Sequence, residues 1–209
     1  TRRATEVGAH ALLLVSPYYN KPTQAGLIAH CRAVADSTEL PIMLYDIPGR
    51  TGIPFATETL VELAGHPQIQ AVKEAAGSVQ RVSQILSRCS LCVLSGDDPL
   101  TLPMMAVGAK GVVSVASNIA PRPVADLVHA ALAGRWDDAR RLHQAWFPLF
   151  SDIFLDTNPI PVKAALALMG LIEEQYRLPL CPLAPALKEK LASTLRALGV
   201  LGAPAASPA

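Results

Sequence analysis

The stretch Ile42-Met-Leu-Tyr-Asp46, followed directly by Ile47-Pro-Gly-Arg-Thr-Gly52, decides the fold class. Its first three residues are all apolar and the run is too short for a helix, which is typical of a strand buried on both faces of a parallel sheet. The Pro-Gly pair predicts a turn directly after the strand. Four more runs of this kind occur along the chain: Ala11-Leu-Leu-Leu-Val-Ser16, Ile69-Gln-Ala-Val-Lys73, Cys92-Val-Leu-Ser-Gly96 and Gly111-Val-Val-Ser-Val-Ala116.

Amphipathic segments separate these runs at residues 24–37, 56–66, 78–88 and 98–107, with Thr23, Thr57 and Ser78 as expected N-caps. Strands that alternate with helices indicate repeated β-α units and a parallel sheet. A doubly wound nucleotide-binding fold would carry a glycine-rich phosphate loop, and the sequence contains neither G-x-G-x-x-G nor a P-loop. We therefore predict an α/β fold, a partial (β/α)8 TIM barrel with about five of its eight strands.

The second part of the chain shows helical patterns alone, at residues 122–133, 136–155, 159–172 and 183–199. The last residues are a low-complexity Ala/Pro stretch. We expect three parts: an incomplete barrel over 1–134 that carries the active-site strand ends, a C-terminal helical region over 135–200 and a disordered tail over 201–209.

Composition excludes several classes of protein. Hydrophobic residues make up 51% of the 209 residues, which argues against disorder, yet no apolar run approaches the roughly 20 residues that span a bilayer. The net charge of +1 and the lack of a basic cluster larger than Arg2-Arg3 argue against nucleic acid as a partner. No targeting segment is recognisable at the start of the sequence, so we expect a cytoplasmic protein.

No metal site is predicted. Cys89 and Cys92 form a C-x-x-C pair, but a zinc site needs a second pair or histidines at ligand spacing. Because Cys92 opens the apolar run Cys-Val-Leu, we expect a buried thiol; a redox pair is the alternative. Asp97 and Asp98 are adjacent carboxylates, but Asp98 precedes Pro99 and is expected as a helix N-cap rather than as a metal ligand.

One lysine of six follows an apolar strand directly, and this is Lys73. An amine at that place faces an interior of low dielectric, which lowers its pKa and keeps part of it neutral. A neutral amine attacks a ketone and forms a Schiff base. The alternative is an ion pair with Glu74, but neighbouring residues of a strand point to opposite sides.

Tyr45 also ends a strand, and its phenol is a candidate proton shuttle for such a lysine; a tyrosine of the core or rim is the alternative. Arg50 lies in the following turn, where a guanidinium suits a substrate carboxylate, unless it is a solvated loop arginine. Tyr18 and Tyr19 lie in a loop flanked by prolines, and interface packing is a simple reason for them.

Six motifs occur together in one order, and with them the sequence resembles the dihydrodipicolinate synthase (4-hydroxy-tetrahydrodipicolinate synthase) family over about residues 1–200. The motifs are Ser16-Pro-Tyr-Tyr-Asn-Lys-Pro-Thr-Gln24, Leu44-Tyr-Asp-Ile-Pro-Gly-Arg-Thr-Gly52, Val72-Lys-Glu-Ala-Ala-Gly77, Leu94-Ser-Gly-Asp-Asp98, Gly111-Val-Val-Ser-Val115 and Asn158-Pro-Ile-Pro-Val-Lys163.

The resemblance implies a lyase of the class I aldolase type that condenses pyruvate with aspartate semialdehyde in lysine (diaminopimelate) biosynthesis. It implies that Lys73 forms the Schiff base with pyruvate and that Tyr45 donates and accepts protons. Tyr19 resembles the relay tyrosine that reaches into the site of the neighbouring subunit. Arg50 would bind the carboxylate of aspartate semialdehyde.

The same resemblance places Gly96 and the backbone of Val113 in the pyruvate pocket. It implies a homotetramer and a reaction without cofactor, through a covalent lysine-pyruvate imine. Tyr18 resembles a position near the lysine-feedback site of regulated members.

The sequence departs from the family at its start. The first three barrel strands, with a Gly-Thr-Thr-Gly-Glu motif whose threonines complete the proton relay and bind the pyruvate carboxylate, have no counterpart here. Residue 1 corresponds to a place inside the third barrel helix, roughly 80 residues late. We therefore expect an N-terminally truncated fragment, with little or no activity by itself.

Two alternatives stay open. The first is a sister pyruvate-dependent lyase, such as N-acetylneuraminate lyase or a keto-deoxy-sugar-acid aldolase. The second is a non-catalytic small-molecule-binding homologue or an inactive fragment.

Overall fold

The computed structural model describes residues 1–202, and its contacts divide the chain into two units, Thr1–Val113 and Ser114–Ala209. This division falls earlier in the chain than the expected end of the barrel part at residue 134, which stays a prediction. Residues 203–209 lie outside the described residues, and with them most of the expected tail over 201–209.

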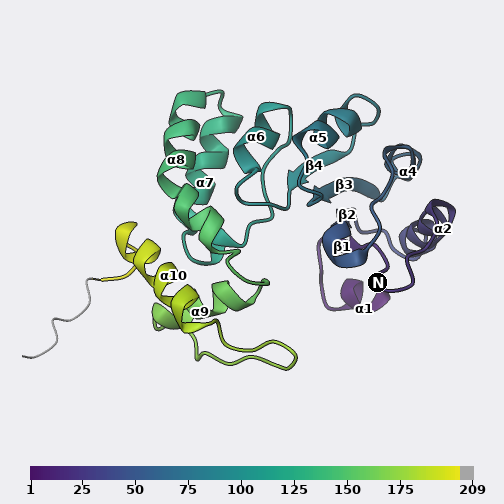
Figure 1. Cartoon of the computed structure of the whole chain (residues 1–209). Coiled ribbons are helices and arrows are strands. Elements are labelled where there is room, and N and C mark those ends of the chain that lie inside the picture. Colours follow the sequence, from purple (N-terminus) through teal and green to yellow (C-terminus); the bar gives the residue numbers. More distant parts are fainter. Residues whose placement is uncertain (203–209) are drawn as a thin grey trace, which may run out of the picture. The chain divides into compact units, whose positions relative to one another are not determined.

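The first unit contains a parallel four-stranded sheet in the order β1-β2-β3-β4 (Figure 1). Its strands are β1 (Leu12–Val15), β2 (Ile42–Asp46), β3 (Ile69–Glu74) and β4 (Cys92–Ser95). Each strand lies beside the next one in the chain, and helices form the crossovers, as in a (β/α)8 barrel. The α/β class and the parallel sheet are thus confirmed.

The helices of this unit are α1 (Arg2–Glu6), α2 (Gln24–Ala35), α3 (Pro48–Thr51), α4 (Thr57–Leu63), α5 (Val79–Leu86) and α6 (Thr101–Ala106). Helices α2, α4, α5 and α6 lie close to the predicted segments, whereas the short α3 forms where the sequence predicts a turn. Thr23 caps α2 by accepting a hydrogen bond from the amide of Gly26, and Ser78 caps α5 by accepting one from Arg81, as expected. The short α1 ends at Glu6, and Gly8, two residues later, has φ +85°, a conformation that suits glycine.

Two expected caps are wrong. The N-cap of α4 is Ala56, and Thr57 is the first helical residue, because the extended backbone that precedes the helix falls one residue earlier. The N-cap of α6 is Leu100, so Asp98 does not hold that place. The backbone carbonyl of Asp98 instead accepts a hydrogen bond from the amide of Thr101, and Asp98 itself is buried.

The predicted fifth strand is reduced to one parallel bridge, between Ser95 and Val112. The amide of Lys110 donates to the carbonyl of Val93, and the amide of Val113 donates to that of Ser95, both at 2.8 Å. The chain therefore still runs beside β4, but among residues 1–202 no strand pairs with its other side. The ladder stays short because the backbone turns helical at Val115, with φ −87° and ψ −43°, and continues into the 3-10 helix η1 (Ala116–Asn118).

The two faces of the sheet differ in what covers them. Ile42, Leu44, Val72 and Val93 are buried on the face that α2, α4 and α5 cover (Figure 1). The side chains between them point to the other face. On that face Leu13 of β1 is 53% exposed. The residues that alternate onto the less covered face include Tyr45 and Lys73, so the strand alternation places the candidate site there.

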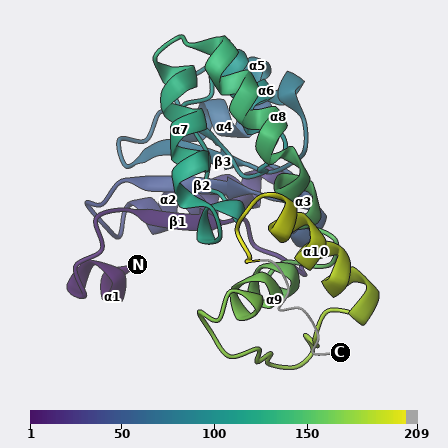
Figure 2. The same cartoon turned by 90° about the vertical axis from the view of Figure 1, so that its left-hand side faces the viewer.

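The second unit is helical, with η1, α7 (Pro121–Leu132), α8 (Trp136–Asp152), α9 (Ile160–Leu168) and α10 (Pro185–Ala197). These helices confirm the four segments that the sequence predicts in this part. Helices α7 and α8 pack together, and α10 packs against α8 and α9 (Figure 2). Asp152 at the end of α8 accepts a hydrogen bond from Thr194 Oγ1 of α10 at 2.6 Å. Within residues 1–202, no helix has both the length and the apolar character that crossing a membrane requires.

Candidate active site

The candidate catalytic pair lies at the carboxyl ends of two neighbouring strands. Tyr45 of β2 and Lys73 of β3 are partners in the parallel register, so their side chains share one face of the sheet. The Lys73 Nζ lies 4.0 Å from the centroid of the Tyr45 ring, and both residues are half-buried. The predicted juxtaposition of an amine and a phenol is therefore present.

Burial changes the acidity of both groups. The surrounding protein lowers the pKa of Lys73 from its usual 10.5 by desolvation, while the negative charge of Asp98 acts in the opposite direction. Desolvation raises the pKa of Tyr45, against a smaller lowering by the positive charge of Arg50. The amine therefore loses its proton more readily than an exposed lysine does, and the phenol stays protonated as a potential donor.

Gly96 allows Lys73 to reach its position. A Cβ atom at residue 96 would lie 2.7 Å from the Cβ of Ala75 and 2.9 Å from the Cε of Lys73. The amide of Gly96 donates a hydrogen bond of 2.8 Å to the carbonyl of Glu74, which ties the end of β4 to the end of β3. Val113 lies at the next position across, where its amide donates to the carbonyl of Ser95.

We expect the substitution Gly96→Ala to lower kcat/KM at least tenfold. The added methyl group must displace the lysine stem or the Cβ of Ala75, and overpacking of this kind costs about 1–3 kcal/mol of folding free energy. Steady-state rates and thermal unfolding, measured on the protein expressed from its complete gene, check this.

The matched control is Gly65→Ala, because the nearest atom to a Cβ there is the carbonyl oxygen of Glu62 at an ordinary 3.4 Å. A Gly96→Ala enzyme with the kinetics of the control would contradict the packing role of Gly96.

Arg50 lies on the short helix α3, which follows β2 directly. Its side chain is exposed, and its charge acts on the hydroxyl of Tyr45. The helix ends at Gly52 with φ +76°, where a Cβ atom would lie 2.8 Å from the Cε of Lys21. Arg50 is thus at the rim of the strand ends, where the sequence places it.

Tyr19 does not join this group within the chain. Its side chain is 95% exposed, and its backbone has φ +67°, a left-handed conformation that is uncommon for a residue other than glycine. Lys21 in the same loop also has a positive φ of 44°, and Tyr18 is exposed as well. The loop therefore presents two tyrosines outward, and the role of Tyr19 stays a prediction.

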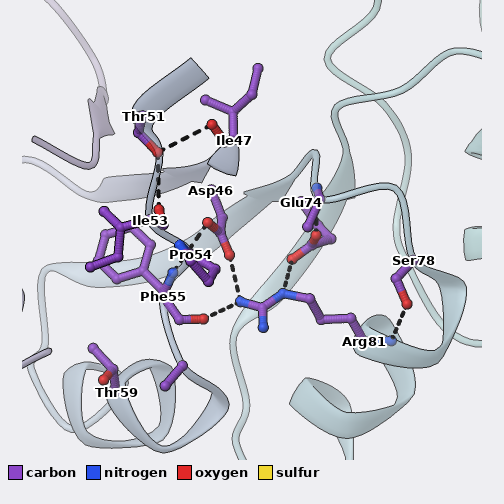
Figure 3. A network of polar contacts seen from close by, with 12 residues as sticks. Asp46, Ile47, Thr51, Ile53, Pro54, Phe55, Thr59, Glu74, Ser78 and Arg81 are labelled. Carbon is purple, nitrogen blue, oxygen red and sulfur yellow. Dashed lines mark hydrogen bonds and ion pairs between the residues drawn. The ribbon is translucent and has the colours of Figure 1, made fainter. Parts of the chain in front are cut away.

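The sequence reasoning missed a buried network directly behind the site. The Arg81 network consists of Arg81 from α5 and the carboxylates of Asp46 and Glu74 (Figure 3). Arg81 Nη2 lies 2.5 Å from Asp46 Oδ2, and Arg81 Nε lies 2.9 Å from Glu74 Oε2. The alternation along β2 and β3 was a usable signal, because it assigns Asp46 and Glu74 to the helix-covered face. The alternative that Glu74 is the ion-pair partner of Lys73 is therefore wrong.

The cysteines do not form a recognisable site. Cys89 is half-buried and Cys92 is exposed, so the expectation of a buried Cys92 thiol is wrong. Cys92 opens β4 on the less covered face, whereas the next residue, Val93, is the buried one. Cys31 in α2 is buried, which raises the pKa of its thiol to about 11. In the described part of the chain, no three His, Cys, Asp or Glu residues are placed to hold a metal ion.

The sequence of this chain is similar to those of known proteins. Residues 1–198 match the Dihydrodipicolinate synthetase family. A 4-hydroxy-tetrahydrodipicolinate synthase of Geobacter metallireducens is 51% identical over 198 residues, which make up 94% of this chain and 68% of that relative.

Solved structures agree with the sequence comparison. The 4-hydroxy-tetrahydrodipicolinate synthase of Methylacidiphilum fumariolicum superposes with a TM-score of 0.94 at 51% identity, over 95% of this chain and 67% of that one. The dihydrodipicolinate synthase of Acinetobacter baumannii, solved in complex with pyruvate, superposes with a TM-score of 0.93 at 42% identity. This match covers 96% of this chain and 70% of that one. The family match covers residues 1–198, and synthases of this family are about half identical in sequence and similar in structure. The chain therefore belongs to the dihydrodipicolinate synthetase family.

Proposed function

We propose that the protein is a lyase of the Schiff-base type that condenses pyruvate with aspartate semialdehyde to 4-hydroxy-tetrahydrodipicolinate, in lysine biosynthesis. The observation that carries this proposal is the half-buried Lys73 at the end of β3, with its Nζ against the ring of Tyr45. The names of the relatives support the substrate pair, since proteins about half identical to this chain are 4-hydroxy-tetrahydrodipicolinate synthases.

The chemistry begins at the neutral amine of Lys73. Its lone pair attacks the ketone carbon of pyruvate, and loss of water leaves an imine between the lysine nitrogen and that carbon. Loss of a proton from the methyl group gives an enamine, whose terminal carbon attacks the aldehyde of the second substrate. The amine of that substrate then attacks the imine carbon, which closes the ring and releases Lys73.

Each proton in this sequence needs a donor or an acceptor within reach. We assign to Tyr45 the protonation of the departing hydroxyl and the return of protons, and the position of the Lys73 Nζ 4.0 Å from the centroid of its ring supports this role. We assign Tyr19 to the same relay in a neighbouring subunit, which fits its nearly full exposure in one chain. Gly96 and the backbone of Val113 line the pyruvate side of the site.

The protonated imine serves as the electron sink, so we propose a reaction that needs neither a metal nor an organic cofactor. A role for Tyr19 across subunits requires an oligomer, and we propose a homotetramer. We further propose that the enzyme acts in the cytoplasm.

Arg50 is proposed to hold the carboxylate of aspartate semialdehyde. We expect Arg50→Gln to raise the KM for this substrate about 10- to 100-fold, because a hydrogen bond to a charged group contributes about 1.5–3 kcal/mol. The KM for pyruvate should change little. Arg50→Lys keeps the charge but not the two-pronged hydrogen-bonding geometry. Its KM for aspartate semialdehyde should lie between those of the natural protein and Arg50→Gln. Equal effects on both KM values would contradict the assignment.

Trapping with borohydride tests the proposed function. The protein from the complete gene is incubated with pyruvate and reduced, and the modified peptide is identified by mass spectrometry. We expect an adduct of pyruvate mass on Lys73 and turnover with aspartate semialdehyde. No adduct on Lys73 would overturn the Schiff-base proposal, and turnover of N-acetylneuraminate in place of aspartate semialdehyde would overturn the substrate assignment.

A further inference from the structure

The Arg81 network and the catalytic pair occupy opposite faces of the same two strand ends. Tyr45 pairs with Lys73 in the register, and the next pair is Asp46 with Glu74. Because side chains alternate along a strand, one pair faces the site and the other faces the helices. A shift at the ends of β2 and β3 therefore moves both pairs together.

The two carboxylates of the network are fully buried and lie on directly opposed strand positions. The side chains of Asp46 and Glu74 are 0% exposed, and that of Arg81 is 14% exposed. Like charges opposite each other on neighbouring strands repel, and burial strengthens the repulsion. The guanidinium between them turns this repulsion into two ion pairs (Figure 3).

The remaining oxygens of the network hold backbone amides beyond the strands. Asp46 Oδ1 accepts a hydrogen bond from the amide of Phe55 at 3.2 Å, and Glu74 Oε1 accepts one from the amide of Ala76 at 2.8 Å. Arg81 Nη2 also donates to the carbonyl of Phe55. All four carboxylate oxygens thus have partners, which gives the network a defined geometry.

The network also connects to the backbone that surrounds Lys73. The carbonyl of Asp46 accepts a hydrogen bond from the amide of Ala75 at 2.9 Å, and that of Glu74 accepts one from the amide of Gly96 at 2.8 Å. The Cβ of Ala75 and the stem of Lys73 both lie close to Gly96. Separation of the two strand ends would therefore open the packing around Lys73 and admit water to its amine.

We propose that Arg81 is a positioning residue for the catalytic pair, because its fork to Asp46 and Glu74 holds β2 and β3 at the spacing that keeps Lys73 against Tyr45. The proposal rests on the proposed function for its meaning in catalysis. A planar guanidinium with several donors in fixed directions can bridge two carboxylates, whereas a lysine ammonium acts as a point charge. Arg81→Lys is therefore the informative variant, since it keeps the charge and loses the fork.

The main readout is the pKa of Lys73, measured by competitive acetylation with acetic anhydride across pH and mass spectrometry of the Lys73 peptide. This readout needs no pyruvate, so it separates failure of the positioning role from failure of the proposed function. The charged and titratable groups that act on the Lys73–Tyr45 pair are Asp98 and Arg50, and neither changes in the variant. A rise in the pKa of Lys73 then reports hydration of the amine.

We expect Arg81→Lys to raise the pKa of Lys73 toward its usual 10.5, at a temperature where thermal unfolding shows the variant to be folded. We expect kcat for the condensation to fall about tenfold, with less than a threefold change in the KM for pyruvate. The control is Arg88→Lys, which alters an exposed ion pair with Glu58 close to the end of the same helix and should change neither quantity.

A lower unfolding temperature with an unchanged pKa and kcat would overturn the proposal, because it would leave Arg81 with a purely structural role. If Arg81→Lys does not fold, the double variant Asp46→Asn with Arg81→Met takes its place. It removes one charge of each sign, so its net charge is that of the natural protein. A folded double variant with the natural Lys73 pKa and kcat would overturn the proposal. A raised Lys73 pKa together with a lowered kcat would support it.

Discussion

Replacement of Lys73 by methionine or arginine is expected to abolish the condensation, with a loss in kcat of about 10^4-fold or more, because neither side chain forms an imine with pyruvate. No borohydride-stable adduct should appear in either variant. The measurement is a single-turnover assay with pyruvate and aspartate semialdehyde, together with mass spectrometry of the reduced protein. The matched control is Lys110→Met, an exposed lysine at the start of the segment beside β4, which should keep full activity. Retained turnover in Lys73→Met would exclude a Schiff base at this residue.

The same substitution has an expected effect on stability, with a defined sign. The folded protein lowers the pKa of Lys73, so the unfolded chain binds that proton more tightly than the folded chain. At a pH below the pKa that Lys73 has in the folded protein, its charged amine therefore destabilises the fold. This destabilisation disappears as the pH rises past 10.5, the pKa of the lysine in the unfolded chain. Lys73→Met should accordingly unfold at a higher temperature than the natural protein at pH 7, with a difference that shrinks toward pH 11. A variant that is less stable at pH 7 would contradict the desolvation of this amine.

Tyr45→Phe is the second substitution with a large expected effect. It removes the hydroxyl and keeps the ring against Lys73, so it tests proton transfer apart from packing. We expect kcat to fall about 10^2- to 10^4-fold, the usual range for loss of a positioned acid or base. The pyruvate adduct on Lys73 should still form, but more slowly, and the rate of its formation is the measurement that separates the two steps.

Tyr176→Phe serves as the control for Tyr45→Phe. Its hydroxyl lies in the second unit, where it donates to the carbonyl of Ile160 and contacts Glu174, and burial raises its pKa to about 12. This variant should keep the natural kcat. A Tyr45→Phe enzyme within threefold of the natural rate would remove Tyr45 from the proton relay.

Local patterns predicted most of the architecture. The order of strands and helices follows from apolar runs and from caps such as Thr23 and Ser78, which depend on residues only a few positions apart. The place of Lys73 at a strand end follows in the same way, and alternation along β3 correctly separates it from Glu74. The strand expected at residues 111–116 was wrong in its extent, because the backbone turns helical at Val115 and Ala116 already belongs to η1.

The candidate site also has features that the local sequence predicts and features that depend on tertiary contacts. The sequence by itself determined which residues lie at the strand ends. Both the alternation of side chains along a strand and the position of a lysine at the end of an apolar run are local properties of the sequence. The tertiary structure decided that the Lys73 amine lies against the Tyr45 ring, and that Cys92 is exposed while Val93 is buried. It also decided that Arg81 reaches Asp46 from 35 residues away. Such contacts arise when a helix packs on a sheet, and the free energy of packing depends on neighbours that are distant in the chain.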